Sequence, residues 1–209
     1  MAASDATACV MQPGERSDAP AATAALADPL VAVLAELAGV LRGVDRLTYR
    51  QPAADGTGGI GAHVRHSLDH VTTLLEGLDT GRIDYDRRVR GTAEETDPTA
   101  AADTAVRLAQ RLGQVRDAAW DRVVQVQAML RPDDPPLVVA CPARRELAFV
   151  LSHSIHHHAM IAGMLRAAGH ATPGTFGYAP ATLAHLRRQQ QCPRDGLAGP
   201  LQQQQQQEQ

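Results

Sequence analysis

Histidines are concentrated in two short segments of this 209-residue chain. Seven of the nine histidines fall within residues 63–70 (HVRHSLDH) and 153–158 (HSIHHH). Imidazole nitrogens are suitable ligands for zinc, nickel, copper and iron. The clustering therefore indicates a transition-metal site, with a metal-free polar histidine network as the alternative.

The spacing within each segment suits a helix, on which each residue advances by about 100 degrees. The first segment places three histidines on one helical face: His63, His66 and His70. In the second segment, His153 and His157 are one turn apart, and His156 lies close to their face. His158 points well away from that face. Two imidazoles one turn apart can hold one ion together.

A third imidazole from a facing helix would complete a three-histidine site that leaves one position open for water or substrate. The core of a helix bundle is a usual place for such a site. An ion bound there could lower the pKa of a bound water towards about 7, or it could bind and activate a thiolate.

Apolar residues at helical spacing place both segments on long helices. We predict four long helices and a shorter fifth, over residues 28–41, 60–78, 98–130, 142–169 and 180–190. Residues 82–97 are charged and aperiodic, which favours a surface loop, and residues 131–141 are a connector broken by proline. Because no segment alternates convincingly with period two, the expected fold is all-α, an antiparallel four-helix bundle.

Composition sets the domain organisation and limits the partners. We expect a disordered leader over residues 1–24, the bundle over 25–190, and a low-complexity Gln-rich tail over 191–209. The net charge of -3 offers no basic face for nucleic acid, and no apolar run reaches the roughly 18 residues that span a membrane. Three widely spaced cysteines indicate a reducing, cytoplasmic location. A small-molecule substrate and a homodimer both fit this picture.

Two segments resemble a known family. FVLSHSIHHHAMIAGMLRAAGH resembles the fourth-helix signature of the DinB/YfiT-like metal-binding superfamily, and GIGAHVRHSLDH is similar to its second helix. The resemblance extends over residues 28–185, with the two histidine segments as its specific part. The chain departs from the usual pattern at 158–160, where it reads His-Ala-Met instead of Arg-Gly-Gln.

The resemblance implies a four-helix bundle with a three-histidine site for a divalent zinc, nickel or iron ion. Matched residue by residue, it implies His66, His153 and His157 as ligands. Members of the superfamily include thiol-dependent transferases and metal-dependent hydrolases or isomerases, and the resemblance alone does not choose among them.

Other side chains are expected near the site. Ligating imidazoles need partners that fix their tautomers; Asp69 follows His66 by three residues, and Glu146 precedes His153 by about two turns. The candidates for lining the cavity or supporting the ligands are His63, Asp69, His70, Glu146 and His156. Tyr85 could cover the site. The arginines that could receive an anionic substrate are Arg65, Arg87, Arg88 and Arg90, although a solvated charged loop explains them better.

Three functions remain open at this point. The first is a metal-dependent enzyme, and the second is a non-catalytic metal-binding or stress-associated bundle protein. The third is a structural bundle whose histidines fill a polar core. An open coordination position on the metal would distinguish an enzyme from a non-catalytic metal-binding protein. A stoichiometric amount of metal in the purified protein would distinguish both from a structural bundle.

Overall fold

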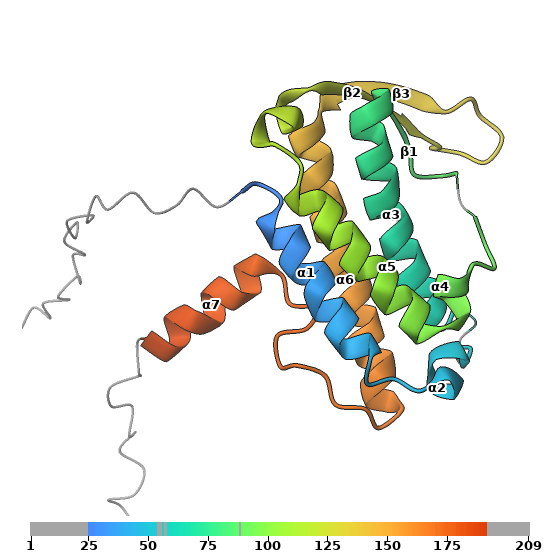
Figure 1. The fold of residues 1–209 in the computed structure, drawn as a ribbon, viewed down its shortest axis with the longest axis vertical. Coiled ribbons are helices and arrows are strands. Elements are labelled where there is room, and N and C mark those ends of the chain that lie inside the picture. Colours follow the sequence, from blue (N-terminus) through green and yellow to red (C-terminus); the bar gives the residue numbers. More distant parts are fainter. Residues whose placement is uncertain (1–24, 54–55, 57, 88, 192–209) are drawn as a thin grey trace, which may run out of the picture.

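The computed structural model describes residues 25–53, 56, 58–87 and 89–191. Four long helices build its body: α1 (Asp28–Leu41), α3 (Ile60–Thr80), α5 (Pro98–Gly113) and α6 (Ala143–Ala167) (Figure 1). Leucines of α1 and α3, alanines of α5 and Val150 of α6 fill the space between them. The predicted leader, and the predicted tail apart from Gln191, lie outside the described residues.

The helices do not all alternate in direction, so the expected antiparallel arrangement holds only for some pairs. The start of α1 meets the chain just beyond the end of α5, where Leu26 N–H donates to Asp117 Oδ1 at 3.1 Å, so α1 and α5 are antiparallel. α3 and α6 are also antiparallel, because His63 lies beside His157 while His66 lies beside His153. α3 and α5 run in the same direction, because the segment after α3 returns the chain to the end where α3 began (Figure 1).

A small sheet at one end of the bundle corrects the all-α prediction. Its strands are β1 (Arg82–Asp84), β2 (Val123–Ala128) and β3 (Leu137–Pro142). β2 is central, pairing parallel with β1 and antiparallel with β3. Ile83 and Val124 turn inward, with 1% exposure each, so the sheet closes that end of the bundle.

The predicted third helix is too long. α5 ends at Gly113, and a 3-10 helix, η1 (Asp117–Asp121), follows it before β2. The sequence VVQVQ fits both helical spacing and the period-two alternation of a strand, and its β-branched valines favour the strand. Pairing with β3 stabilises the strand over a helix, because Val124 lies opposite Cys141 and Val126 lies opposite Val139 in the ladder.

Short helices complete the chain: α2 (Arg46–Arg50), α4 (Ala93–Thr96) and α7 (Pro180–Gln191). The range predicted as a surface loop, 82–97, therefore contains both β1 and α4. The predicted short C-terminal helix is present as α7, which has no buried residue. None of the helices in the described ranges is both long and apolar enough to cross a membrane.

Capping residues explain why the start of α5 and the end of α3 could be predicted from the sequence. Asp97 accepts a hydrogen bond from Thr99 N–H at 2.9 Å, and Pro98 opens α5, as expected for a capped N-terminus. Gly81 ends α3 with a φ of 74°, a left-handed conformation that favours glycine.

Candidate metal centre

The two histidine segments lie opposite one another on α3 and α6. His153 Nε2 is 3.1 Å from His66 Nε2 and also 3.1 Å from His157 Nε2. The two helices therefore bring together the three residues that the family resemblance implied as ligands. His66 and His153 are partly buried, and His157 is buried.

His70 belongs to the same cluster. Among the described residues, His66, His70 and His153 can place one ligand nitrogen each within 4.8 Å of one another. The ring of His70 stacks on that of His153 with centroids 4.1 Å apart. Among the described residues, this triad is the group that meets the 4.8 Å distance, and His157 is an alternative third ligand through its 3.1 Å contact with His153.

The donor set fits a divalent transition metal. Two imidazole nitrogens on a tetrahedral zinc ion, each about 2.0–2.1 Å from the metal, would lie about 3.3 Å apart. The two Nε2 separations of 3.1 Å are close to that value. Neutral imidazoles without a thiolate suit zinc, nickel or iron, so the residues present suit the group that the resemblance implies.

Two hydrogen-bonding contacts orient the cluster from outside. His63 Nδ1 lies 3.0 Å from His157 Nδ1, so one ring donates to the other while His157 Nε2 stays directed at His153. His70 Nδ1 lies 2.9 Å from the backbone oxygen of His66, an acceptor. The His70 Nδ1–H therefore donates there, and its lone pair is on Nε2. Such contacts fix the tautomer of a ligating histidine.

Two aromatic rings cover the cluster on the side near the sheet. Tyr85, the residue expected to cover the site, stacks on His70 with centroids 4.8 Å apart and planes 5° from parallel. Phe149 stacks on His153 at 5.6 Å and contacts Tyr85 at 5.3 Å. Phe149 was missed in the sequence, although its position one helical turn before His153 is a signal that could have revealed it.

Glu146 is 4% exposed and lies beyond this aromatic cover. Its carboxylate accepts a hydrogen bond from Cys141 Sγ at 3.3 Å and lies 3.4 Å from Arg145. Burial, followed by the charge of Glu146, raises the pKa of Tyr85, so this phenol keeps its proton. Burial and the same carboxylate also raise the pKa of Cys141. The position of Cys141 in a connector had given no sign of this contact.

The remaining predicted residues are Asp69, His156 and the arginines. Asp69 accepts a hydrogen bond from Arg65 at 2.6 Å, and Glu95 pairs with the same guanidinium at 3.2 Å. Arg65 is therefore held by two carboxylates. Arg88 lies outside the described residues, whereas Arg87 and Arg90 are exposed. His156 is exposed and borders a separate cavity on α6.

His158 points away from the cluster, as its helical phase predicted. It is 1% exposed and stacks on Phe176, with centroids 4.9 Å apart. Burial lowers its pKa to about 4. Burial also lowers the pKa of His157 to about 3, with further contributions from His153 and His63. Both rings are therefore neutral near pH 7.

We expect the metal-free protein to lose stability as the pH falls below about 6.5. His157 and His158 have lower pKa values when folded than when unfolded, so protons bind preferentially to the unfolded chain. Their stabilising effect is complete above pH 6.5 and is lost towards pH 3–4. Each histidine contributes about 2 kcal/mol to the loss between pH 7.5 and pH 5.

Urea unfolding of chelator-treated protein at several pH values measures this effect. The variant His158→Phe removes one of the two groups and should flatten the pH dependence by roughly half. A free energy of unfolding that stays constant or rises as the pH falls from 7 to 5 would contradict the assignment.

Comparisons with known proteins complete the description of this centre. No family model matches the chain. One curated protein, FK506-binding protein 5 of Rhizopus delemar, is 28% identical over 108 residues. The match covers 51% of this chain and 28% of that protein, which is too little to show a family.

Two solved structures from Bacillus subtilis are similar to this chain in fold. The DinB-like protein YjoA matches with a TM-score of 0.54 and 16% identity, covering 72% of this chain and 97% of YjoA. YfiT, a probable metal-dependent hydrolase with an unusual four-helix bundle topology, matches with a TM-score of 0.50 and 19% identity. That match covers 69% of this chain and 89% of YfiT. The chain therefore has the fold of the DinB-like proteins, as the resemblance of its two histidine segments predicted.

Proposed function

We propose that this protein binds one divalent transition-metal ion through His66, His153 and His157 and uses it to hydrolyse a small molecule. The observation that carries the proposal is the approach of His66 Nε2 and His157 Nε2 to His153 Nε2, at 3.1 Å each. Nitrogen separations of this size suit ligands that share one ion. A site with three protein ligands keeps a position for water or substrate, whereas structural sites are usually closed by four.

A bound ion would supply Lewis acidity, which polarises a substrate oxygen and makes a water molecule more acidic. The chain's own residues do the rest. His63 holds the ring of His157 in place through the Nδ1 contact of 3.0 Å. Tyr85 and Phe149 lie over His70 and His153 and restrict water on that side. Tyr85 stays protonated, so this cover carries no phenolate charge.

Hydrolysis is favoured over thiol transfer by two observations. YfiT, which shares the fold, is a probable metal-dependent hydrolase. Arg65, the buried arginine of the set considered for anionic thiols, is already paired with Asp69 and Glu95. A non-catalytic metal-binding protein is the alternative, and it needs the same ligands without turnover.

Activity of the reconstituted protein tests this proposal. Protein purified without a His-tag is stripped with a chelator, reloaded with zinc, nickel or iron(II), and assayed with the chromogenic ester 4-nitrophenyl acetate. We expect at least one metal to restore hydrolysis at tenfold or more above the stripped protein, and His153→Ala to stay at the stripped level. Binding of one ion without hydrolysis of this ester or of a panel of esters and amides would contradict the hydrolase and support the non-catalytic alternative.

The choice between His157 and His70 as third ligand is a separate prediction. We expect His157→Ala to abolish stoichiometric metal binding, because it removes an Nε2 that faces His153. His70→Ala is the matched control and should lower zinc affinity by about tenfold, the effect expected of a supporting residue. Competition with a chromogenic chelator measures both affinities. Full binding by His157→Ala together with loss in His70→Ala would assign the site to His66, His70 and His153.

A further inference from the structure

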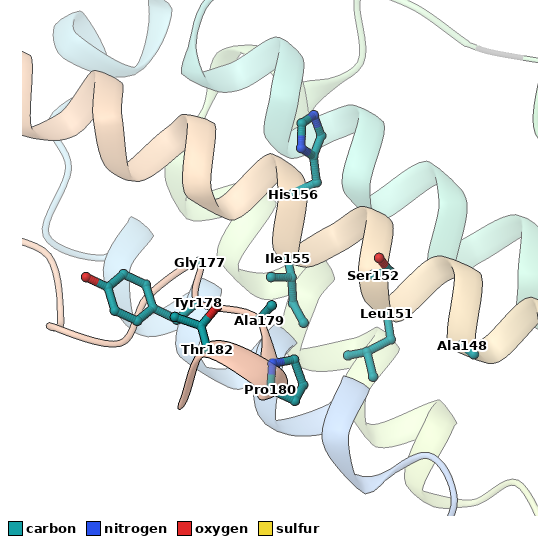
Figure 2. Close-up of a pocket in the computed structure, with 10 residues that line it drawn as sticks. All are labelled: Ala148, Leu151, Ser152, Ile155, His156, Gly177, Tyr178, Ala179, Pro180 and Thr182. Atoms are coloured by element: carbon teal, nitrogen blue, oxygen red, sulfur yellow. The ribbon is translucent and has the colours of Figure 1, made fainter. Parts of the chain in front are cut away.

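A second cavity lies on the opposite side of α6 from the histidine cluster. It has a volume of about 390 Å³, is partly open to solvent, and is lined by α1, α6, the loop that follows α6 and the start of α7. A neighbouring cavity of about 530 Å³ shares part of its wall: Leu151, Ile155, Gly177, Tyr178 and Pro180. Figure 2 shows Ile155 and Leu151 on the side of α6 that faces Pro180, whereas His156 projects from the other side. Volumes of this size are typical of small-molecule sites.

A buried polar atom belongs to the wall of the smaller cavity, called here the His158 cavity. His158 is 1% exposed, and its Nε2 has no hydrogen-bond partner within the described part of the chain. A buried ring nitrogen left without a partner costs free energy. A polar group that enters from the cavity and reaches this atom would therefore be stabilised.

The loop that holds His158 is fitted tightly to α6. Gly177 has a φ of 80°, and a Cβ at this position would lie 2.5 Å from the backbone nitrogen of Ala159. Only glycine permits this approach, and it fixes the neighbouring Phe176 against the His158 ring at 4.9 Å. The packing of Phe176 against the His158 ring therefore fixes the orientation of the imidazole in the absence of a ligand.

The remaining polar groups of the wall restrict the charge of a ligand. Glu36 lines the same cavity, and its carboxylate lies 3.5 Å from the hydroxyl of Thr175. A carboxylate in the wall repels anions and accepts hydrogen bonds. The rest of the wall is mainly apolar, with Val33, Leu151 and Leu183.

We propose that the His158 cavity binds a small, uncharged, mainly apolar molecule whose hydroxyl or amine group donates a hydrogen bond to Glu36 or pairs with His158 Nε2. The bound molecule lies between α1, α6 and α7, behind the helix that carries His153 and His157. This site is independent of the metal centre and of the proposed hydrolysis.

A pair of fluorescent probes tests the site. N-phenyl-1-naphthylamine is neutral and apolar and carries one N–H donor, whereas 1-anilinonaphthalene-8-sulfonate is a related anion. We expect saturable, one-to-one binding of the neutral probe and binding at least tenfold weaker for the anion. Glu36→Gln should reduce this discrimination. Equal binding of the two probes by the native protein would overturn the proposed preference for an uncharged donor.

Three variants locate the binding. Ala32→Trp places a bulky side chain at an exposed position of α1 that borders the cavity, and we expect it to weaken binding of the neutral probe at least tenfold. His158→Phe keeps an aromatic ring against Phe176 but removes Nε2, and we expect a loss of about two- to tenfold, as for one hydrogen bond. Ala167→Leu, in a separate cavity of about 240 Å³, is the control and should leave binding unchanged.

Probe binding at the His158 cavity and metal binding at the histidine cluster are tested independently. Retained metal binding and native circular dichroism in Ala32→Trp and His158→Phe would show that the variants fold. Unsaturable probe binding, or equal binding by the native protein and Ala32→Trp, would overturn the proposal and leave the cavity as a space for water. Neither result would affect the metal centre.

Discussion

Replacing His153 by alanine is expected to reduce the metal content of the purified protein from one ion per chain to a trace. His153 Nε2 is the atom that both His66 Nε2 and His157 Nε2 approach at 3.1 Å, and His153 is common to both possible triads. Its removal leaves at most one histidine of α6 in the cluster facing α3. Elemental analysis of tag-free protein by inductively coupled plasma mass spectrometry measures the change.

The matched control is His158→Ala, five residues further along the same helix. Its ring is buried against Phe176 on the other side of α6, so metal content should stay at the native level even where stability falls. Circular dichroism of both variants checks that the helices remain. Full metal in His153→Ala, or loss of metal in His158→Ala, would contradict the helical phase on which the site is built.

Replacing Trp120 by alanine is expected to lower the free energy of unfolding by about 3–5 kcal/mol. Trp120 is 0% exposed and belongs to the hydrophobic core where η1 connects α5 to the sheet. Alanine there leaves a large cavity that rigid neighbouring helices fill only in part. Urea unfolding followed by circular dichroism measures the loss, since this variant has no tryptophan left for fluorescence.

A smaller change at the same position separates packing from hydrogen bonding. The Nε1 of Trp120 has no hydrogen-bond partner among the described residues, so Trp120→Phe removes volume without breaking a hydrogen bond. We expect it to cost less than half as much as Trp120→Ala. An alanine variant that unfolds at the native urea concentration would show that this end of the bundle contributes little to stability.

The helices that carry the histidines were predictable because local signals agree with the tertiary structure. α3 begins at Ile60 and ends before a left-handed Gly81, and α6 begins directly after Pro142. Within these helices, phase placed His63, His66 and His70 on one face and His153 and His157 on another, and it turned His158 away. The choice of His66, His153 and His157 as ligands came from the family resemblance. The antiparallel pairing of α3 and α6 then brought the two faces together.

The sheet was not predictable from the same signals. Residues 115–130 carry valines at spacings that suit a helix and a strand equally well, so periodicity could not decide between them. The decision comes from β3, which pairs with β2 across a turn rich in proline and aspartate. Long-range pairing of this kind leaves little trace in a local window.

The surroundings of the histidines also depend on distant contacts. Tyr85 reaches His70 because β1 pairs with β2 and fixes the start of the following loop. The burial of His158 depends on Phe176, which is held over α6 by Gly177. In the sequence, these aromatic residues lie 15 or more positions from the histidines they cover, beyond the range of a helical pattern.

The metal content of the native protein, purified without a histidine tag, tests the central claim most directly. A site formed by His66, His153 and His157 predicts close to one zinc, nickel or iron ion per chain after gel filtration, and retention of that ion through dialysis against metal-free buffer. Less than a tenth of an ion per chain, with no uptake when any of the three metals is added to the chelator-stripped protein, would contradict it.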